Sequence, residues 1–325
     1  MKLIRISRLA VPLAVGALLL SACGGDNNTD DAAASTGGNG GSQQVSGSVK
    51  VDGSSTVAPL TTAAAEFFKE EQPGVNVTVG TSGTGGGFEK FCAGETDISD
   101  ASRPIDDADE VPICEEAGVE YGEIPVANDA LTVVVSAEND WVDCLTTEQL
   151  KAIWEPGSKV DSWKDVDPSY PDEKLELFGP GTDSGTFDYF TDVINGEEGA
   201  SREDYSPSED DNVIVQGVSG SSGGLGYFGY TYYEENSDTL KALEIDSGDG
   251  CVAPSAETAQ DGTYTPLSRP LFIYPSKAAT EKPEVKAFLE FYLENDAQIA
   301  EAAQYIPLND EQKSEAQSAF DSLVG

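Results

Sequence analysis

Three turns of this chain combine glycine with serine and threonine where a short apolar run gives way to a helix-like segment. Their sequences are GSSTV at 53–57, GTSGTGGG at 80–87 and GPGTDSGT at 179–186. Glycine lets a backbone approach a ligand closely, a helix start presents free N–H groups to an anion, and the hydroxyls add further donors. Helix capping alone accounts for any one such turn, but the repetition favours an oxyanion-binding site.

An arginine lies in one further turn, which is rich in serine and aspartate and comes third of the four along the chain. Arg103 belongs to DISDASRP at 97–104, in a chain with 18 basic and 59 acidic residues. An arginine beside acids is usually half of a surface ion pair, but close to donor-rich turns it is the best candidate for a bidentate oxyanion ligand. A nucleotide-binding P-loop would require a lysine that these turns lack, so we expect no ATP site of that kind.

The composition excludes several classes of function. The chain has a formal net charge of −41 and no histidine. Nucleic acids and anionic lipid surfaces are therefore poor partners, and histidine-dependent triads, dyads and zinc sites are impossible. The sequence predicts no catalytic residue, no metal and no cofactor. An anion site remains compatible with the charge, because salt screens distant charges over about 8 Å whereas donors act at about 3 Å.

The N-terminus has the pattern of a lipoprotein signal. A basic start precedes the apolar run 9–20, which is shorter than the roughly 20 residues that span a bilayer, and LSAC ends at Cys23. We expect 1–22 to be a signal peptide, Cys23 to carry the lipid, and 23–47 to be a flexible tether. The body would then lie on the extracytoplasmic side of the cell membrane, held by its lipid anchor only. A plain secretory signal with a chance cysteine is the alternative.

Strand-like and helix-like segments alternate through the remaining chain. An alternating strand at 48–52 precedes a helical pattern at 60–69, and a second strand at 75–79 precedes another helical start. This alternation predicts an α/β architecture with helix-flanked sheets. The extended segments 122–135 and 269–274 are long enough to cross between two halves of the molecule.

Four cysteines remain once Cys23 is assigned to the lipid: Cys92, Cys114, Cys144 and Cys251. An even number in an exported protein predicts two disulfides, for which three pairings are possible. A metal site is the rival interpretation, and the absence of histidine and of C-x₂-C spacing argues against it.

The four turns, in this order, resemble the ligand loops of PstS-like phosphate-binding proteins of phosphate ABC transporters. The resemblance extends over nearly all of the chain after the tether. It implies a phosphate site whose ligands are Ser55, Thr56, Val57, Thr84, Ser102, Arg103, Ser184, Gly185 and Thr186.

The chain departs from that family's pattern at two places, one of which is Ser102, where another version of the third turn has an aspartate. Many members carry an arginine shortly before Ser-Gly-Thr, where this sequence has Pro180, Gly181 and Thr182. Arg103 is therefore expected to be the only cation of the site. The carboxylate that accepts the proton of HPO₄²⁻ and repels sulfate is assigned to Asp183 first and to Asp100 second.

The resemblance also implies a fold and a mode of action. The fold is the two-lobed type II periplasmic-binding-protein fold, with two helix-flanked mixed sheets joined by a two-strand hinge. Lobe 1 is expected to hold 48–128 and 268–325, and lobe 2 to hold 129–267. The protein would be a monomer that captures inorganic phosphate between the lobes and passes it to the membrane permease of an ABC transporter, without being an enzyme.

Such proteins close by bending at the hinge, and this favours one disulfide pairing. Cys92–Cys114 and Cys144–Cys251 each stay within one expected lobe, whereas either other pairing would tie lobe to lobe twice and impede closure. Two alternative functions stay open: the same fold binding sulfate, molybdate or tungstate, and an exported hydrolase that uses serine and carboxylates.

Overall fold

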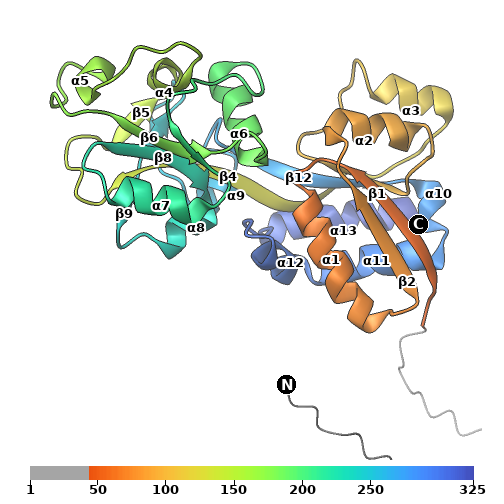
Figure 1. Cartoon of the computed structure of the whole chain (residues 1–325). Helices are drawn as coiled ribbons and strands as arrows, with labels where there is room; N and C mark the ends of the chain where they lie inside the picture. The colour runs from red at the N-terminus through yellow and green to blue at the C-terminus, as the bar shows by residue number, and fades with distance from the viewer. Residues whose placement is uncertain (1–43) are drawn as a thin grey trace, which may run out of the picture. The chain divides into compact units, whose positions relative to one another are not determined.

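The structure is a computed structural model that describes residues 44–325 (Figure 1). The expected signal peptide, Cys23 and the expected tether up to residue 43 lie outside the described residues. The folded part begins slightly earlier than the sequence suggested. The first strand starts at Gly47, and the Val45 N–H donates to Gln72 Oε1 at 3.0 Å, so the last residues assigned to the tether belong to the fold.

One half of the molecule is built on parallel strands from the N-terminal region. β1 (Gly47–Gly53) lies between β2 (Val75–Gly80) and β3 (Ile98–Ala101) and runs parallel to both. Helices from both ends of the chain cover these strands (Figure 1): α1 (Ala58–Glu71), α2 (Gly83–Cys92), α3 (Val111–Ala117), α10 (Lys277–Thr280), α11 (Pro283–Glu294), α12 (Asp296–Ala302) and α13 (Asp310–Val324). The chain therefore returns to its first half after building the second.

The other half comes from the middle of the chain. Its part of the large sheet contains β6 (Glu176–Pro180), β7 (Ser206–Ser208), β8 (Gly224–Gly229) and β9 (Leu240–Ala242). A separate small sheet contains β5 (Cys144–Thr146), β10 (Glu244–Asp246) and β11 (Cys251–Val252). The helices of this half are α4 (Thr147–Trp154), α5 (Trp163–Val166), α6 (Gly185–Phe190), the π-helix η1 (Thr191–Asn195), α7 (Asp211–Ser219), α8 (Tyr230–Glu235) and α9 (Ala256–Gln260).

Two antiparallel strands join the halves: β4 (Ile124–Ser136) and β12 (Ser268–Pro275). All 13 residues of β4 are buried, because its first part pairs with β12 and its second part pairs with β8 and β9. The path of the large sheet is β2-β1-β3-β12-β4-β8-β6-β7. The prediction of an α/β fold with two halves joined by two strands is confirmed, and the strands of the halves form one continuous sheet.

The apolar core is divided in the same way. Val126 of β4 and Leu271 of β12 belong to a cluster with α1 and α11, whereas Leu131 of β4 and Leu267 belong to a cluster with α4 and β8. Burial of apolar side chains is worth about 25 cal/mol per Å², so each half has its own source of stability. No helix among the described residues combines the length and apolar character needed to cross a membrane.

Both predicted disulfides are present. Cys92–Cys114 joins the C-terminus of α2 to α3, and Cys144–Cys251 joins β5 to β11. Each bridge lies within one half, as the closure argument requires, so the predicted pairing is confirmed.

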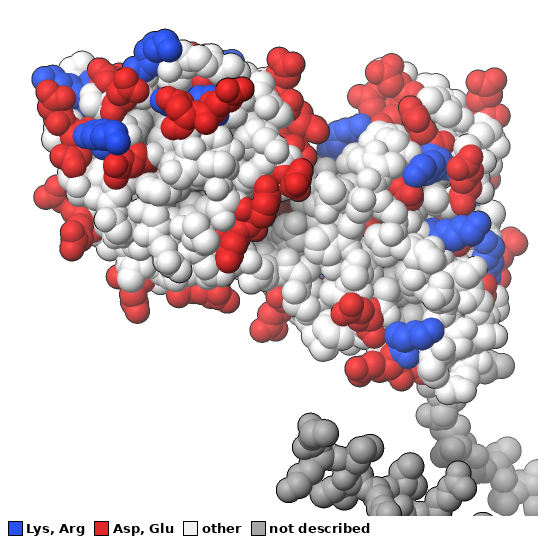
Figure 2. All heavy atoms as spheres, in the orientation of Figure 1, with Lys and Arg blue, Asp and Glu red and all other residues white. Residues whose placement is uncertain are grey.

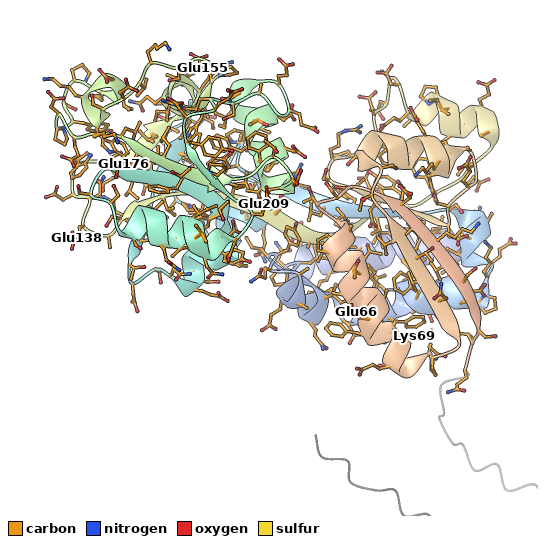
Figure 3. All side chains as sticks on the ribbon, in the orientation of Figure 1. Glu66, Lys69, Glu138, Glu155, Glu176 and Glu209 are labelled. Carbon is orange, nitrogen blue, oxygen red and sulfur yellow. A yellow bond between two sulfur atoms is a disulfide. The ribbon has the colours of Figure 1, made fainter. Side chains whose placement is uncertain are left out.

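Charged side chains gather on the surface. Figure 3 shows Glu138, Glu155, Glu176 and Glu209 on one half, and Glu66 and Lys69 on α1 of the other. On the face drawn in Figure 2, aspartate and glutamate are spread over both halves and exceed lysine and arginine. On this face, the acidic excess is therefore shared by both halves.

Candidate anion-binding site

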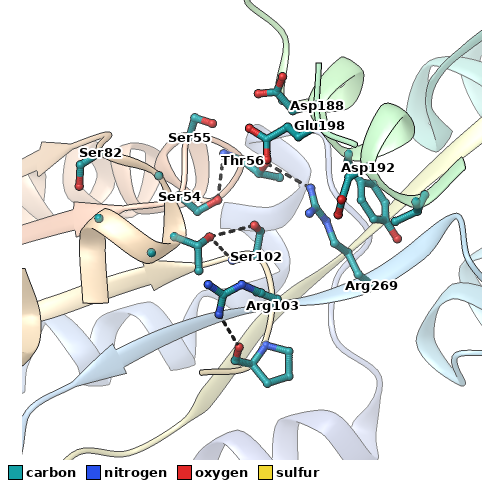
Figure 4. Close-up of a pocket in the computed structure, with 18 of the residues that line it drawn as sticks. Ser54, Ser55, Thr56, Ser82, Ser102, Arg103, Asp188, Asp192, Glu198 and Arg269 are labelled. Atoms are coloured by element: carbon teal, nitrogen blue, oxygen red, sulfur yellow. Dashed lines mark hydrogen bonds between the residues drawn. The ribbon is translucent and has the colours of Figure 1, made fainter. Parts of the chain in front are cut away.

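A cavity of about 500 Å³ lies between the two halves, and we call it the cleft cavity (Figure 4). Its lining comes from the three N-terminal turns, from α6, η1 and the segment after them, and from β12. The lining residues are Ser54, Ser55, Thr56, Ser82, Gly83, Thr84, Gly85, Gly86, Ser102, Arg103, Pro104, Gly185, Asp188, Tyr189, Asp192, Val193, Glu198, Arg269 and Pro270.

The first turn lies between β1 and α1. β1 ends at Gly53, whose φ is +149°, and a Cβ on Gly53 would lie 2.1 Å from the backbone oxygen of Asp100, so only glycine fits there. Ser54 Oγ accepts a hydrogen bond of 3.2 Å from the Thr56 N–H. Ser54, Ser55 and Thr56 all line the cavity, and the last two are predicted ligands. Val57, the third predicted ligand of this turn, is fully buried and does not line the cavity.

The second turn is the N-terminus of α2, and Asp52 at the end of β1 holds it. Asp52 accepts hydrogen bonds from the N–H of Ser82 at 3.1 Å, from the Ser82 hydroxyl, and from Lys90 Nζ at 2.7 Å. Burial raises the pKa of Asp52, but its bonds with Lys90 and Ser82 outweigh this and lower it. The Ser82 hydroxyl is thus already committed to a carboxylate, whereas Thr84 faces the cavity.

Thr84 and Ser102 are neighbours across the second and third turns. Their hydroxyls are 3.1 Å apart, and the Ser102 N–H donates to Thr84 Oγ1 at 3.2 Å. Both of these predicted ligands line the cleft cavity. This pair fixes the third turn, and hence Arg103, relative to α2.

Arg103 lines the cavity and is held by an acid from its own segment. Its Nη1 and Nη2 donate to the two carboxylate oxygens of Glu110, each at 2.8 Å. The hydrogen bond to Glu110 is the main reason that the pKa of Arg103 is raised. The side chain is 47% exposed, so Arg103 stands at the edge of the cavity.

A second arginine lines the cavity, so the expectation that Arg103 is the only cation is wrong. Arg269 on β12 lies opposite Asp129 on β4, and its Nε donates to Asp129 Oδ2 at 3.2 Å. Its Nη2 donates to Thr56 Oγ1 at 3.3 Å, and its guanidinium carbon is 3.7 Å from the ring centroid of Tyr189. The sequence showed Arg269 only as part of an extended crossing segment.

The fourth turn is arranged differently from the prediction. Ser184 caps α6 by accepting from the Thr186 N–H at 3.2 Å, and Gly185 lines the cleft cavity. Thr186 instead lines a smaller cavity of about 170 Å³, and Ser184 lines neither. Asp183 is exposed, and its N–H donates to Glu209 Oε1 at 3.4 Å. The first choice for the proton-accepting carboxylate therefore lies outside the cleft cavity.

Three other acids line the cavity from the second half: Asp188, Asp192 and Glu198. Asp188 and Asp192 are four residues apart on consecutive helical turns, so they share one face. Burial and then Glu198 raise the pKa of Asp188, and Arg269 opposes them. The spacing of the two aspartates was visible in the sequence, but the position of that face at the cleft cavity was not.

Asp100, the second choice, lies beneath the site. It is fully buried on β3, its Oδ1 accepts from Thr61 Oγ1 of α1 at 2.9 Å, and Oδ2 has no hydrogen-bond partner among the described residues. Burial raises the pKa of Asp100 to about 8. It does not line the cavity, so its carboxyl group stays out of reach of a ligand there.

Comparisons with known proteins agree with this geometry. The family model described as "PBP superfamily domain" matches residues 38–296. Protein SphX of Synechocystis sp. is 46% identical over 94% of this chain and 87% of its own length, and the phosphate-binding protein PstS of Staphylococcus saprophyticus is 41% identical over 86% of each chain. The crystal structure of a possible phosphate binding protein from Planctomyces limnophilus is 47% identical, with a TM-score of 0.82 over 87% of this chain and 100% of that one.

Proposed function

The chain belongs to the PBP superfamily and, within it, to the PstS-like phosphate-binding proteins; from this premise we propose that it captures inorganic phosphate in the cleft cavity for an ABC transporter. The observation that carries the proposal is that two arginines and several serine and threonine hydroxyls of the first half line one cavity in a chain of net charge −41. Its fold is that of a two-lobed type II periplasmic-binding protein.

The donors of the cavity suit a tetrahedral oxyanion. Of the predicted ligands, Ser55, Thr56, Thr84, Ser102, Arg103 and Gly185 line the cavity. Hydrogen bonds to a charged group contribute roughly 1.5–3 kcal/mol each, and a micromolar ligand needs only about −8 kcal/mol in total. Several such bonds therefore suffice after the costs of dehydration and closure.

We propose that two lobes close around the anion by bending at a hinge. We place lobe 1 at 48–128 and 268–325 and lobe 2 at 129–267, with β4 and β12 as the hinge. The separate apolar clusters on either side of Asn128 and Asp129 support these boundaries. A Cβ on Gly185 would come within 2.9 Å of Thr56 Oγ1, so glycine permits the lobes to approach at this point. Closure would then bring the donors of Ser184 and Thr186 toward the anion, and Val57 would contribute only its backbone N–H.

The role of proton acceptor passes in this proposal from Asp183 to Asp188. Asp188 lines the cavity and its pKa is raised, whereas Asp183 is exposed outside it. A carboxylate can accept the proton of HPO₄²⁻ but repels sulfate, which carries none at neutral pH, so Asp188 would exclude sulfate.

The protein acts outside the cytoplasm, as PstS-like binding proteins do. We propose in addition that Cys23 carries a lipid anchor, that the protein is a monomer without catalytic activity, and that it delivers phosphate to the membrane permease of the transporter.

Detergent-phase partition tests the lipid anchor. The full chain should enter the detergent phase, and the Cys23→Ala variant should not. Hydrolysis of a phosphomonoester by the purified protein would contradict the absence of catalysis.

Calorimetry on protein freed of bound ligand tests the main proposal. Phosphate and arsenate should bind with micromolar or tighter affinity, and sulfate should bind at least about 100-fold more weakly. Tight sulfate or molybdate binding with weak phosphate binding would assign the cavity to another oxyanion.

A further inference from the structure

Arg269 touches both halves of the molecule and both crossing strands. It stands on β12 and is paired with Asp129 on β4. Its Nη2 reaches Thr56, which precedes α1 in the first half, and its guanidinium lies over the ring of Tyr189, which belongs to α6 in the second half. Figure 4 shows it at the junction, between Thr56 and Asp192.

The guanidinium keeps donors that the protein does not use. Arginine has five N–H donors, and the described residues accept from Nε and Nη2 only, at 3.2 and 3.3 Å. Nη1 has no hydrogen-bond partner among the described residues, although the side chain is only 18% exposed. A cation this far from water with spare donors that faces a polar cavity is suited to an anionic ligand.

The surroundings fix the orientation of Arg269. Asp129 is 5% exposed and holds Nε, and Tyr189 packs against the guanidinium face while its hydroxyl donates to the Pro266 oxygen at 2.7 Å. Because Asp129 and Tyr189 already fix the guanidinium, its side chain loses little conformational entropy when it binds an oxyanion. Arg103, by contrast, is 47% exposed and gives both of its terminal nitrogens to Glu110.

We propose that Arg269 is the principal anion-binding cation of the cleft cavity, contacting phosphate through Nη1 and Nη2, and that it takes the place of the arginine that the fourth turn lacks. This inference rests on the proposed function and names a residue for it. Because Arg269 lies at the junction of the halves, its contact with the anion links binding directly to closure.

Two changes at Arg269 separate charge from geometry. Arg269→Lys keeps the charge and loses the planar fork, so phosphate affinity should fall by about 10-fold; Arg269→Gln loses both and should cost about 100-fold. Lys174→Gln, which removes one positive charge from an exposed position in the second half, is the matched control and should bind as the wild type does.

Removing Arg269 alone leaves Asp129 buried without its partner, so a second variant protects the test from a folding defect. Asp129→Asn/Arg269→Gln replaces the ion pair with a neutral pair that can still form hydrogen bonds. Its melting temperature without phosphate should lie close to that of the wild type, and its phosphate affinity should still be about 100-fold weaker.

The outcomes distinguish this inference from the proposed function. If the wild type binds no phosphate, the proposed function fails. If the wild type binds phosphate and the folded double variant binds it within threefold of the wild type, Arg269 is not a ligand and the inference is overturned. A loss larger in Arg103→Ala than in the double variant would also overturn it, since Arg103 would then be the principal cation.

Discussion

Each arginine of the cleft cavity is held by one carboxylate. Glu110 binds Arg103, Asp129 binds Arg269, and both acids lie on the lobe-1 side or the hinge. A carboxylate behind an arginine orients it and lowers its net attraction for a second anion. Local geometry, rather than the charge of the whole chain, therefore sets the affinity of the site.

Arg103→Ala should weaken phosphate binding by about 10-fold, because one charge-assisted hydrogen bond contributes roughly 1.5–3 kcal/mol and Arg269 remains. Titration calorimetry measures the change.

Glu110→Gln is the opposite test: it removes a negative charge and frees the terminal nitrogens of Arg103, so phosphate affinity should stay the same or increase. Weaker binding in Glu110→Gln would show that Arg103 depends on Glu110 for its position.

Asp188→Asn should narrow the preference for phosphate over sulfate by about 10-fold or more, because an amide does not repel a proton-free anion. Competition between the two anions measures the ratio. Asp183→Asn is the matched control outside the cavity and should leave the ratio unchanged. If Asp183→Asn alone changes the ratio, the original assignment to Asp183 is correct.

At the scale of elements, β3 and α1 are joined through Asp100 and Thr61 beneath the first and third turns. The carboxyl is fully buried, and its pKa is raised from 3.8 to about 8 by burial. The folded chain therefore keeps a proton that the unfolded chain releases above pH 4. Between about pH 4 and pH 8 this difference makes the folded state less stable as the pH rises.

Asp100→Asn should remove the decrease in stability between about pH 4 and pH 8 that Asp100 causes. The free energy of unfolding of the variant minus that of the wild type should increase from pH 5 to pH 8, by up to about 1.4 kcal/mol per pH unit. Denaturant unfolding at pH 5, 6.5 and 8 measures it, with Asp140→Asn, an exposed position, as the control. A difference that does not change with pH would mean that Asp100 is ionised in the folded protein.

The disulfides brace elements within each half. Cys92–Cys114 closes a separation of 22 residues between α2 and α3, which corresponds to about 3 kcal/mol in the chain-entropy treatment. The Cys92→Ala/Cys114→Ala variant should lose about that much stability while phosphate affinity changes by less than threefold, because the bridge lies away from the cleft cavity. A large loss of affinity with unchanged stability would place the bridge in control of α2 and its glycine turn.

At the scale of the whole molecule, repulsion among acidic groups opposes folding. The 59 acidic residues exceed the 18 basic ones, and Figure 2 shows them on both halves. Added salt screens this repulsion over a Debye length that falls from about 10 Å at 0.1 M to 3 Å at 1 M. Added salt also weakens attractive ion pairs, but the 59 acidic groups make repulsive pairs more numerous than attractive ones.

The melting temperature should therefore rise between 0.05 and 1 M NaCl, by several degrees for a change of a few kcal/mol. Differential scanning calorimetry without phosphate measures it. An equal concentration of sucrose is a control for effects other than screening. A melting temperature that falls with salt would mean that specific ion pairs outweigh the general repulsion.

The sequence alone determined the features that depend on local chemistry. The alternation of strand-like and helix-like segments predicted the α/β fold. The sequence also predicted that the glycine turns at 53–57 and 80–87 lie where a strand ends and a helix begins. Helix capping, the alternative interpretation of these turns, is found at Ser184, because a capping hydroxyl acts within two or three residues. The sequence alone left three disulfide pairings open, and the choice among them rested on the hinge closure that the family resemblance implied.

Tertiary structure decided which side chains meet across the cavity. Arg269 gave no local signal, and it becomes a candidate ligand only because β12 pairs in register with β4 and places it between Thr56 and Tyr189. Asp183 and Asp188 are both aspartates near the start of α6, and the sequence does not distinguish them. The packing of α6 decides that Asp188 lines the cavity and Asp183 does not. Contacts between residues that are far apart in the sequence depend on the register and packing of whole elements, and no short stretch of sequence encodes them.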